Sequence, residues 1–380
     1  MLHIHTVILT LICSSLVVPY AFAEEIAEVS KASWVDHLLK QLGSSDTVDN
    51  SKLIDWGVLP GPFVNPEQGL GIGIAAVGLY TPYDWAAGDH YSTVTLTSYA
   101  STSGSFGVGI ENRTYLAQDR LRLLADAWFS HSPGYYWGVG KEAAETDQNK
   151  TQYDAQIIRL EPKIALQIID NTYLTSGWSY QSVTRLDPDL GVFTNHDLKD
   201  SQLSGIVTAL EYDSRDFEPN PRSGNLLSVE WTTYRPHFGS DFDFNRWTIN
   251  ARHYWQISTH TIIAVEGYGQ AVDGDIPWYG YSEMGSAQRM RGYYEGQYRD
   301  RAQLSTQLEV RHSFNHRHGM VTWIGAGNLA PAVDALFDEN WLPTVGIGYR
   351  FAFKARINVR VDLGVGKDST GFYFHVNEAF

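Results

Sequence analysis

The chain has 380 residues with a formal net charge of −15, 13% aromatic residues, 34 glycines and only 19% charged residues. The negative charge argues against nucleic acid as a partner, and no segment after residue 23 approaches the roughly 18 apolar residues that a membrane-spanning helix requires. Many aromatic residues and glycines without a long apolar run are typical of an outer-membrane β-barrel.

The first 23 residues are predicted to be a secretory signal peptide. An apolar run extends from Val7 to Val18, and residues 21–23, Ala-Phe-Ala, fit the small-x-small rule for cleavage before Glu24. The only cysteine, Cys13, lies inside this run. We therefore expect a mature chain of 357 residues (380 minus 23) that has no disulfide and no thiol chemistry.

Residues 24–55 are polar and are expected to form a periplasmic arm. Ser33 is a candidate N-cap, and Trp34, Leu38 and Leu42 recur at the spacing of one helix face. The pattern predicts a short amphipathic helix in this arm. A segment of this length is too short for an independent folded domain.

From residue 56 to residue 380 the hydrophobic pattern has a period of two, which indicates β-strands. In residues 355–365 the odd positions are apolar and the even positions are polar, including Arg360 and Asp362. In a barrel the apolar face contacts lipid and the polar face lines the lumen. Fifteen segments fit this interpretation: 69–80, 90–101, 104–115, 119–130, 153–168, 171–183, 202–213, 223–235, 243–256, 259–271, 302–314, 318–328, 344–351, 355–365 and 370–380.

A sixteenth strand is expected at residues 56–64, because bacterial single-chain barrels usually have an even number of strands. Pro60 and Pro62 in this segment cannot donate to a hydrogen-bond ladder, so the strand should be a poor edge. The predicted fold class is all-β: a transmembrane antiparallel β-barrel of about 16 strands with both chain ends in the periplasm. The long connections, which include residues 272–301, then lie on the outer side.

Three local patterns are more specific than a generic barrel. They are Tyr212-Asp213-Ser214-Arg215-Asp216 followed by Pro221 and Gly224, then Met290-Arg291-Gly292-Tyr293, and finally Arg360 to Gly366 with Asp362 and Gly364, followed by residues 371–374 and a terminal Phe380. In this order and spacing they resemble the BamA/TamA superfamily of outer-membrane insertases and translocases, also called the bacterial surface antigen family. The resemblance covers roughly residues 57–380.

The resemblance implies a 16-stranded barrel whose first and last strands meet at a weak seam. It also implies that a long sixth loop folds into the lumen and carries the motif Arg291, Gly292 and Tyr293, whose arginine docks on acidic groups of the barrel wall. Glu309 matches one of these acids. The family usually offers a second acid on the next strand, where this chain has Gly325, so we expect a lid that docks more loosely.

The other two motifs are given structural roles. We expect Asp213, Arg215, Pro221 and Gly224 to cap and pin a periplasmic hairpin. The C-terminal strand motif comprises Arg360, Asp362, Gly364 and Phe380. Phe380 is expected on the lipid-facing side of the last strand together with Phe372 and Phe374, and the resemblance makes that strand the signal read by the barrel-assembly machinery.

The well-studied members of the family carry periplasmic POTRA domains that receive clients, and residues 24–55 are too short for one. The chain therefore resembles a barrel-only branch. The leading hypothesis is a protein that helps to insert, translocate or organise outer-membrane components without covalent chemistry. Its expected partners are outer-membrane lipid, outer-membrane or secreted protein clients and the machinery for its own insertion.

The alternative from a different class is a passive outer-membrane pore for ions or small solutes. The sequence offers no recognisable catalytic arrangement of Ser, His and acidic residues, and His316 and His318 have no acidic or cysteine ligand nearby. We therefore predict no enzyme activity, no cofactor and no metal. The expected location is the outer membrane of a Gram-negative bacterium.

Overall fold

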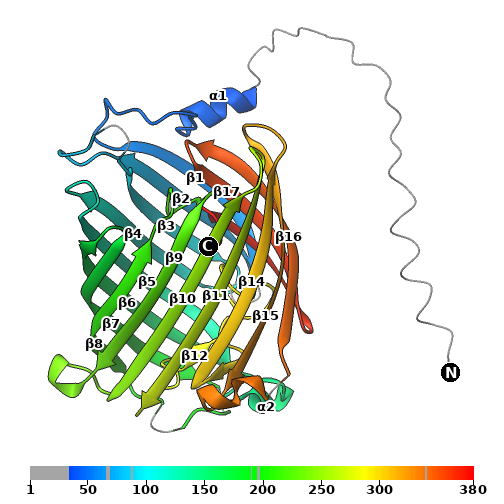
Figure 1. Ribbon diagram of the computed structural model, residues 1–380. Helices are drawn as coiled ribbons and strands as arrows, with labels where there is room; N and C mark the ends of the chain where they lie inside the picture. Colours follow the sequence, from blue (N-terminus) through cyan, green and yellow to red (C-terminus); the bar gives the residue numbers. More distant parts are fainter. Residues whose placement is uncertain (1–33, 66–68, 87–88, 190, 195–196, 339) are drawn as a thin grey trace. The chain divides into compact units, whose positions relative to one another are not determined.

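The computed structural model describes residues 34–380 except 66–68, 87–88, 190, 195–196 and 339; the side chains of residues 34–36 and 65 are also not described. The predicted signal peptide, residues 1–23, lies outside the described residues. Sixteen strands close into one antiparallel barrel in which neighbours in the sheet are neighbours in the chain, apart from the closing pair and the long connection from β11 to β14 (Figure 1). The predicted all-β barrel is confirmed.

The barrel strands are β1 (Asp55–Asn65), β2 (Gly69–Tyr80), β3 (Ser92–Ser101), β4 (Phe106–Leu116), β5 (Leu121–Tyr136), β6 (Thr151–Ile169), β7 (Thr172–Pro188), β8 (Ser201–Asp213), β9 (Gly224–Tyr234), β10 (Phe244–Gln256), β11 (Thr261–Gly274), β14 (Ala302–Ser313), β15 (His318–Ala330), β16 (Leu342–Lys354), β17 (Ile357–Gly366) and β18 (Ser369–Val376). Two short strands, β12 (Ser282–Glu283) and β13 (Arg299–Asp300), pair with each other within the connection between β11 and β14.

The described helices are all short. They are α1 (Trp34–Gln41), α2 (Lys141–Ala144) and the 3₁₀ helices η1 (Asp147–Asn149), η2 (Pro236–Phe238) and η3 (Val333–Phe337). None of the helices in the described ranges is long and apolar enough to cross a membrane.

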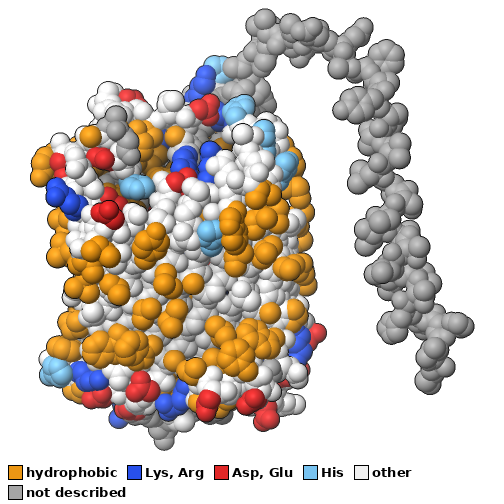
Figure 2. All heavy atoms as spheres, viewed as in Figure 1, with side chains coloured by type: hydrophobic (Ala, Val, Ile, Leu, Met, Phe, Trp, Pro, Cys, Tyr) orange, Lys and Arg blue, Asp and Glu red, His pale blue; other side chains and the backbone are white. Residues whose placement is uncertain are grey.

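The side chains alternate between the outer wall and the lumen, as the period of two predicts. In β16, Val345, Ile347 and Tyr349 are exposed on the outer wall, whereas Thr344 and Arg350 are buried on the inner face. Figure 2 shows hydrophobic side chains spread over the barrel wall and charged side chains gathered toward its two ends. This distribution matches a wall that contacts lipid between two wet surfaces.

The two ends of the barrel carry different connections. One end, which we name the loop end, carries the long connections 137–150, 189–200, 275–301 and 331–341. The other end, which we name the turn end, holds the start of β1 and short turns such as 170–171 and 355–356. Residues 275–301 are the sixth connection at the loop end and are called loop 6 below.

The barrel closes between β1 and β18, and this seam is its weakest junction. The two strands are joined at a single residue pair, Val64 with Phe372. By contrast, β1 pairs with β2 along its whole length, from Asp55 to Asn65. The weak seam implied by the family resemblance is therefore present.

The prolines of β1 explain why the seam is short. The N–H of Val58 points toward the seam side, where it donates to the carbonyl of Leu42 at 2.7 Å. Alternate residues of an antiparallel strand direct their backbone groups to the same neighbour, so Pro60 and Pro62 face the seam as well. Since proline has no N–H, β1 lacks two donors on the side where β18 would have to pair.

Apolar side chains fill the turn-end half of the seam in place of a hydrogen-bond ladder. The ring of Phe374 occupies the space that a side chain at Gly61 of β1 would need. A cluster of buried and partly buried residues surrounds it: Leu39, Leu42, Leu59, Phe351, Phe353, Val359 and Val376. This half of the seam is therefore closed by packing, which can separate without breaking backbone pairs.

The expected position of Phe380 is wrong. The last strand ends at Val376, and residues 377–380 turn away from it, so Phe380 is buried rather than lipid-facing. Phe372 is exposed on the outer wall as expected, and Phe374 is only partly buried in the seam cluster.

Cysteine crosslinking tests the seam. We expect Val64→Cys/Phe372→Cys to form a disulfide completely, because the two residues are paired and Cα atoms across such a pair lie within disulfide range. Continuing that register by four residues, Pro60→Cys/Val376→Cys should crosslink only in part. Gel migration with and without reductant measures both pairs. Complete crosslinking of both would show a continuous ladder like that of a plain porin.

Candidate functional site

Loop 6 folds into the lumen and is held tightly against the inner face of β16–β18. Arg291 and Tyr293 are fully buried. The N–H of Gly292 donates to the hydroxyl of Tyr373 at 2.9 Å, and the hydroxyl of Ser369 donates to the carbonyl of Gly292 at 2.6 Å. The predicted lumenal motif is therefore part of the closed barrel interior.

The close contact depends on glycines on both sides. A Cβ at Gly364 of β17 would lie 2.7 Å from the carbonyl carbon of Arg291, so only glycine leaves room for the loop backbone. Gly292 has φ of 108°, a conformation that favours glycine, and a Cβ there would lie 2.6 Å from the amide nitrogen of Gly366. The C-terminal strand motif and the loop motif therefore pack directly against each other.

Tyr293 anchors the loop beyond the glycine. Its hydroxyl donates to the carbonyl of Pro343 at 2.6 Å and accepts from the N–H of Lys367 at 2.8 Å. Its ring lies against Gly366, where a side chain would overlap it. The tyrosine therefore connects loop 6 to both β16 and the end of β17.

Arg291 forms ion pairs with two buried acids. Its guanidinium bonds to Glu309 of β14 and, at 2.7 Å, to Asp362 of β17, and it lies 3.6 Å from the ring centre of Trp323. The pairing with Glu309 follows the prediction. The expected loss of the second acid is wrong, because Asp362 supplies it from another strand, and Trp323 stacks on the guanidinium beside Gly325.

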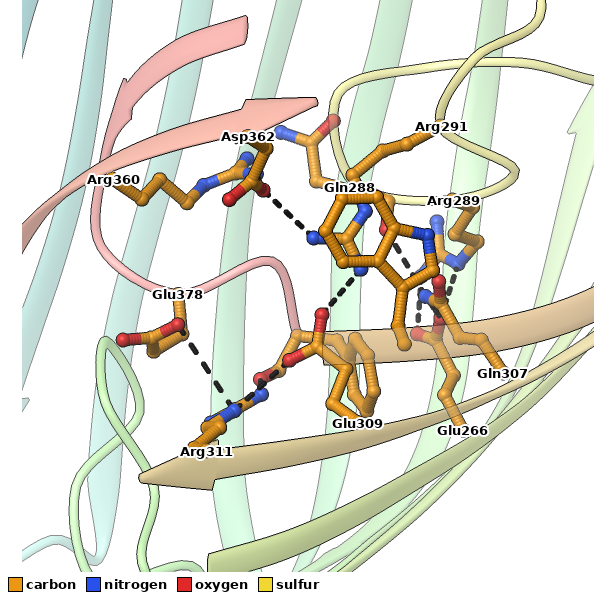
Figure 3. A network of polar contacts seen from close by, with 12 residues as sticks. Glu266, Gln288, Arg289, Arg291, Gln307, Glu309, Arg311, Arg360, Asp362 and Glu378 are labelled. Carbon is orange, nitrogen blue, oxygen red and sulfur yellow. Dashed lines mark hydrogen bonds and ion pairs between the residues drawn. The ribbon is translucent and has the colours of Figure 1, made fainter. Parts of the chain in front are cut away.

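Further charges extend this dock into a network (Figure 3). Glu309 also pairs with Arg311 at 2.9 Å, and Asp362 pairs with Arg350 at 2.5 Å and Arg360 at 2.7 Å. Every carboxylate thus has more than one guanidinium partner. We call the seven side chains of this cluster the dock network: Arg291, Glu309, Arg311, Arg350, Arg360, Asp362 and Glu378.

A second dock was not identified from the sequence. Arg289 contacts Glu266 of β11 at 3.0 Å, and Glu266 also bonds to Arg252 at 2.9 Å and to the amide of Gln307 at 2.8 Å. Figure 3 shows Arg289 and Arg291 reaching different parts of the wall. The available signal was the pattern Arg-Met-Arg, which places a second arginine directly before the recognised motif.

The base of loop 6 is fixed by aromatic packing near the loop end. Trp278 is buried against Tyr136, Tyr153 and Phe193, with ring centres 5.0–5.4 Å apart. Arg299 donates to the carbonyl of Trp278 at 3.0 Å and pairs with Glu283 in the same loop at 2.9 Å. These contacts therefore hold the two ends of loop 6 together near the loop end of the barrel.

At the turn end, the connection between β8 and β9 folds across the lumen. Asp213 pairs with Arg215 at 2.8 Å and with Arg122 of β5 at 2.8 Å. Gly224 has φ of 101°, and a side chain there would overlap the carbonyl of Ser214. These residues pin the hairpin as predicted from the sequence, but the hairpin also bonds to a distant strand.

The rest of this connection reaches the opposite wall. Glu218 accepts from the hydroxyl of Tyr115 at 2.8 Å, and Asp216 pairs with Arg356 at 2.8 Å. Phe217 is buried against a cluster from β2 and β17: Val77, Leu79 and Ile357. We call residues 214–223, together with the tail 377–380, the turn-end plug.

The C-terminal tail completes this plug. The backbone N–H of Glu378 donates to the carbonyl of Pro219 at 3.0 Å, and its carboxylate pairs with Arg350 at 2.7 Å. Arg311 donates to the backbone oxygen of Phe380 at 2.8 Å and, through a long hydrogen bond of 3.5 Å, to the carbonyl of Pro221. The tail therefore connects the turn-end plug to the dock network.

One cavity in the lumen borders the seam. A cavity of about 550 Å³ is bounded by Phe63 of β1 and by Phe374 and Val376 of β18. Its other walls include Trp128 and Glu111 and the loop 6 residues 286–288. The cavity is therefore enclosed by the loop on one side and by the weakest strand pair on another.

Substitutions in the dock network should lower the free energy of unfolding by different amounts. Among the described residues, Asp362 is the only carboxylate that pairs with Arg360. Asp362→Asn removes this partner and leaves a buried charge without compensation, which typically costs about 3–5 kcal/mol. Arg291→Ala should cost less, because Glu309 and Asp362 each keep another arginine. Both variants should raise open-channel conductance, with the larger loss of unfolding free energy for Asp362→Asn.

Denaturant unfolding and planar-bilayer recordings measure these two quantities. Arg120→Ala is the matched control, since Arg120 is exposed and donates to a turn carbonyl. If Arg291→Ala were as destabilising as Asp362→Asn, or if neither variant changed conductance, the described network would not be what holds the loop.

Acid should not open the turn-end plug until the pH is very low. Burial acts to raise the pKa of Glu378, but Arg350 and Arg311 outweigh it and lower the pKa from 4.5 to about 2. Because the folded-state pKa is depressed, the stabilisation is complete above the unfolded value and is lost as the pH falls through about 2. Conductance should therefore stay constant from about pH 7 to about pH 4. A reversible rise within that range would contradict the pairing.

Comparison with known proteins places this architecture in a family. The Omp85 superfamily domain matches residues 90–367, and none of the curated protein sequences matches the chain. Solved structures with similar folds include BamA from Haemophilus ducreyi lacking POTRA domains 1–3, which is 13% identical with a TM-score of 0.54, over 90% of this chain and 76% of that one.

Two CdiB structures are also similar. CdiB from Escherichia coli is 12% identical with a TM-score of 0.60, over 87% of this chain and 63% of that one, and CdiB from Acinetobacter baumannii is 9% identical with a TM-score of 0.58, over 86% and 60%. The chain thus spans less than two thirds of the CdiB chains, and at these identities the likeness concerns the fold. The match over residues 90–367, on a closed 16-stranded barrel, establishes that the chain belongs to the Omp85 superfamily of outer-membrane translocation and assembly barrels.

Proposed function

We propose that this protein acts at its seam to help insert, translocate or organise outer-membrane components, without covalent chemistry. In this proposal it resides in the outer membrane of a Gram-negative bacterium, with the turn end in the periplasm and the loop end outside. The observation that carries the proposal is the seam itself, where β1 and β18 share the single pair Val64 and Phe372.

The lumen offers little support for a passive pore. Loop 6 is docked by buried ion pairs from Arg289 and Arg291, and the turn-end plug crosses the opposite mouth. A solute would have to displace both. Breaking a buried ion pair is costly, whereas β1 and β18 meet each other in the turn-end half of the seam mainly through apolar contacts.

The seam also provides what a client strand would need. From Asp55 to Phe63, the seam-facing edge of β1 is not paired with β18. An unpaired strand edge can accept another strand by backbone hydrogen bonding. Phe63 of this edge lines the cavity of about 550 Å³. Proposed clients are therefore outer-membrane or secreted proteins that present extended segments, with lipid as the surrounding solvent.

A disulfide across the seam tests this function. The variant Val64→Cys/Phe372→Cys is reconstituted into liposomes, and the folding of a urea-unfolded, eight-stranded outer-membrane barrel is followed by its heat-modifiable gel migration. We expect the reduced variant to accelerate folding of this client. Oxidation should remove the acceleration, because the strands can no longer separate.

The control pair is Leu96→Cys/Ile110→Cys, which joins β3 and β4 at paired, outward-facing positions away from the seam. Oxidation of this pair should leave the acceleration intact. Acceleration that survives oxidation of the seam pair, or a barrel that never accelerates folding and conducts steadily in both redox states, would overturn the proposal and favour a passive pore.

A further inference from the structure

Residues 39–46, which precede β1, run beside the turn-end half of the seam and contact strands on both sides of it. On the β1 side, Val58 donates from its N–H to the carbonyl of Leu42 at 2.7 Å. On the other side, the N–H of Ser45 donates to the carbonyl of Phe353 at 3.1 Å, and the hydroxyl of Ser44 donates to the same carbonyl at 2.8 Å. Phe353 belongs to β16, two strands beyond β18 in the sheet.

Charged side chains reinforce these backbone contacts. Lys354 donates to the carbonyl of Gly43 at 3.1 Å and pairs with Asp55, the first residue of β1, at 2.8 Å. Arg317, in the turn before β15, pairs with Asp46 at 3.2 Å and donates to Ser44 at 3.0 Å. The segment is thus fastened to β1, to the end of β16 and to the turn before β15.

Apolar side chains of the same segment complete the packing. Leu39 and Leu42 lie against the cluster that closes the turn-end half of the seam, including Leu59 of β1 and Phe353 of β16. Separating β1 from β18 in this half would therefore expose these residues or require the segment to detach first.

We infer that residues 39–46 form a latch that keeps the turn-end half of the seam closed. This latch must detach before β1 and β18 can separate. This inference rests on the proposed function for its biological meaning, because it concerns the regulation of the same seam. The latch makes one backbone hydrogen bond to β1 that β18 does not make, and it makes another to β16 on the other side of the seam. Detachment of a short segment would therefore remove contacts on both sides of the seam together.

Gly43 provides a way to detach the latch without altering the barrel. It has φ of 89°, and a side chain there would overlap the carbonyl of Trp56. Gly43→Val should therefore displace the segment. Gly104→Val is the matched control, because Gly104 has φ of 86° but no atom near its Cβ position, so it carries similar backbone strain away from the seam.

The readout is the alkylation rate of a cysteine at Leu59, which is buried beneath the latch. Cys13 lies in the predicted signal peptide, so the introduced cysteine is the only thiol of the expected mature chain. With N-ethylmaleimide, Gly43→Val should raise the alkylation rate of Leu59→Cys by about 5- to 30-fold, the range expected when one or two favourable contacts are lost. Gly104→Val should leave it unchanged.

Two further variants keep the test decisive. Leu203→Cys, buried in β8, reports global loosening and should not respond to Gly43→Val. If Gly43→Val fails to fold, Ser44→Ala/Arg317→Gln removes the milder latch contacts and should raise the rate at Leu59→Cys in the same direction.

An unchanged rate at Leu59→Cys in folded latch variants, or an equal rise at Leu203→Cys, would overturn the latch. The client-folding assay separates this result from the proposed function. If the latch variants expose residue 59 but do not alter client folding, the latch stands and the seam-based function fails.

Discussion

The absence of two backbone donors on one edge of β1 is the constraint from which the rest of the architecture follows. Pro60 and Pro62 face the seam, so β18 cannot form a continuous ladder with β1. The barrel still closes, because the paired residues Val64 and Phe372 hold one point and an apolar cluster fills the remainder. A barrel built in this way has one junction whose two strands share a single residue pair.

The interior is arranged so that opening at this junction does not require opening of the lumen. Loop 6 is held by buried guanidinium–carboxylate contacts and by close backbone packing at Gly364, and these contacts resist displacement. The turn-end plug joins the dock network through Glu378 and Arg311. The wall near β14–β17 is therefore rigid, whereas β1 depends on apolar contacts and on the latch.

Much of the fold could be predicted from the sequence because alternation and turn residues are local signals. Fifteen strands overlap the segments that the period of two predicts, β1 overlaps the segment that the even strand number predicts, and its poor pairing follows from Pro60 and Pro62. Phe380 was misplaced because alternation alone cannot show where a strand stops: Asn377 adopts a positive φ and turns the tail into the lumen, where Glu378 finds Arg350.

The site was only partly predictable, because its contacts join residues far apart in the chain. Arg291 and Glu309 were identified as partners through the family resemblance, and their inward directions follow from the strand pattern. Asp362 was recognised only as part of a strand motif, since nothing local reveals that β17 lies beside loop 6. The latch could not be foreseen at all, because it depends on the end of β16 and the turn before β15 meeting residues 43–46 in space.

The central claim is that the seam is the mobile part of a barrel whose lumen is firmly closed. Hydrogen–deuterium exchange of the protein in lipid nanodiscs, resolved by residue, tests it most directly. The account predicts fast exchange at the seam-facing amides of Val58, Phe374 and Val376, because the alternate amides of β1 and β18 bond to β2 and β17 instead, with slow exchange in loop 6 residues 289–293 and in β6 and β7. Slow exchange at all three seam-facing amides, or fast exchange across loop 6, would contradict it.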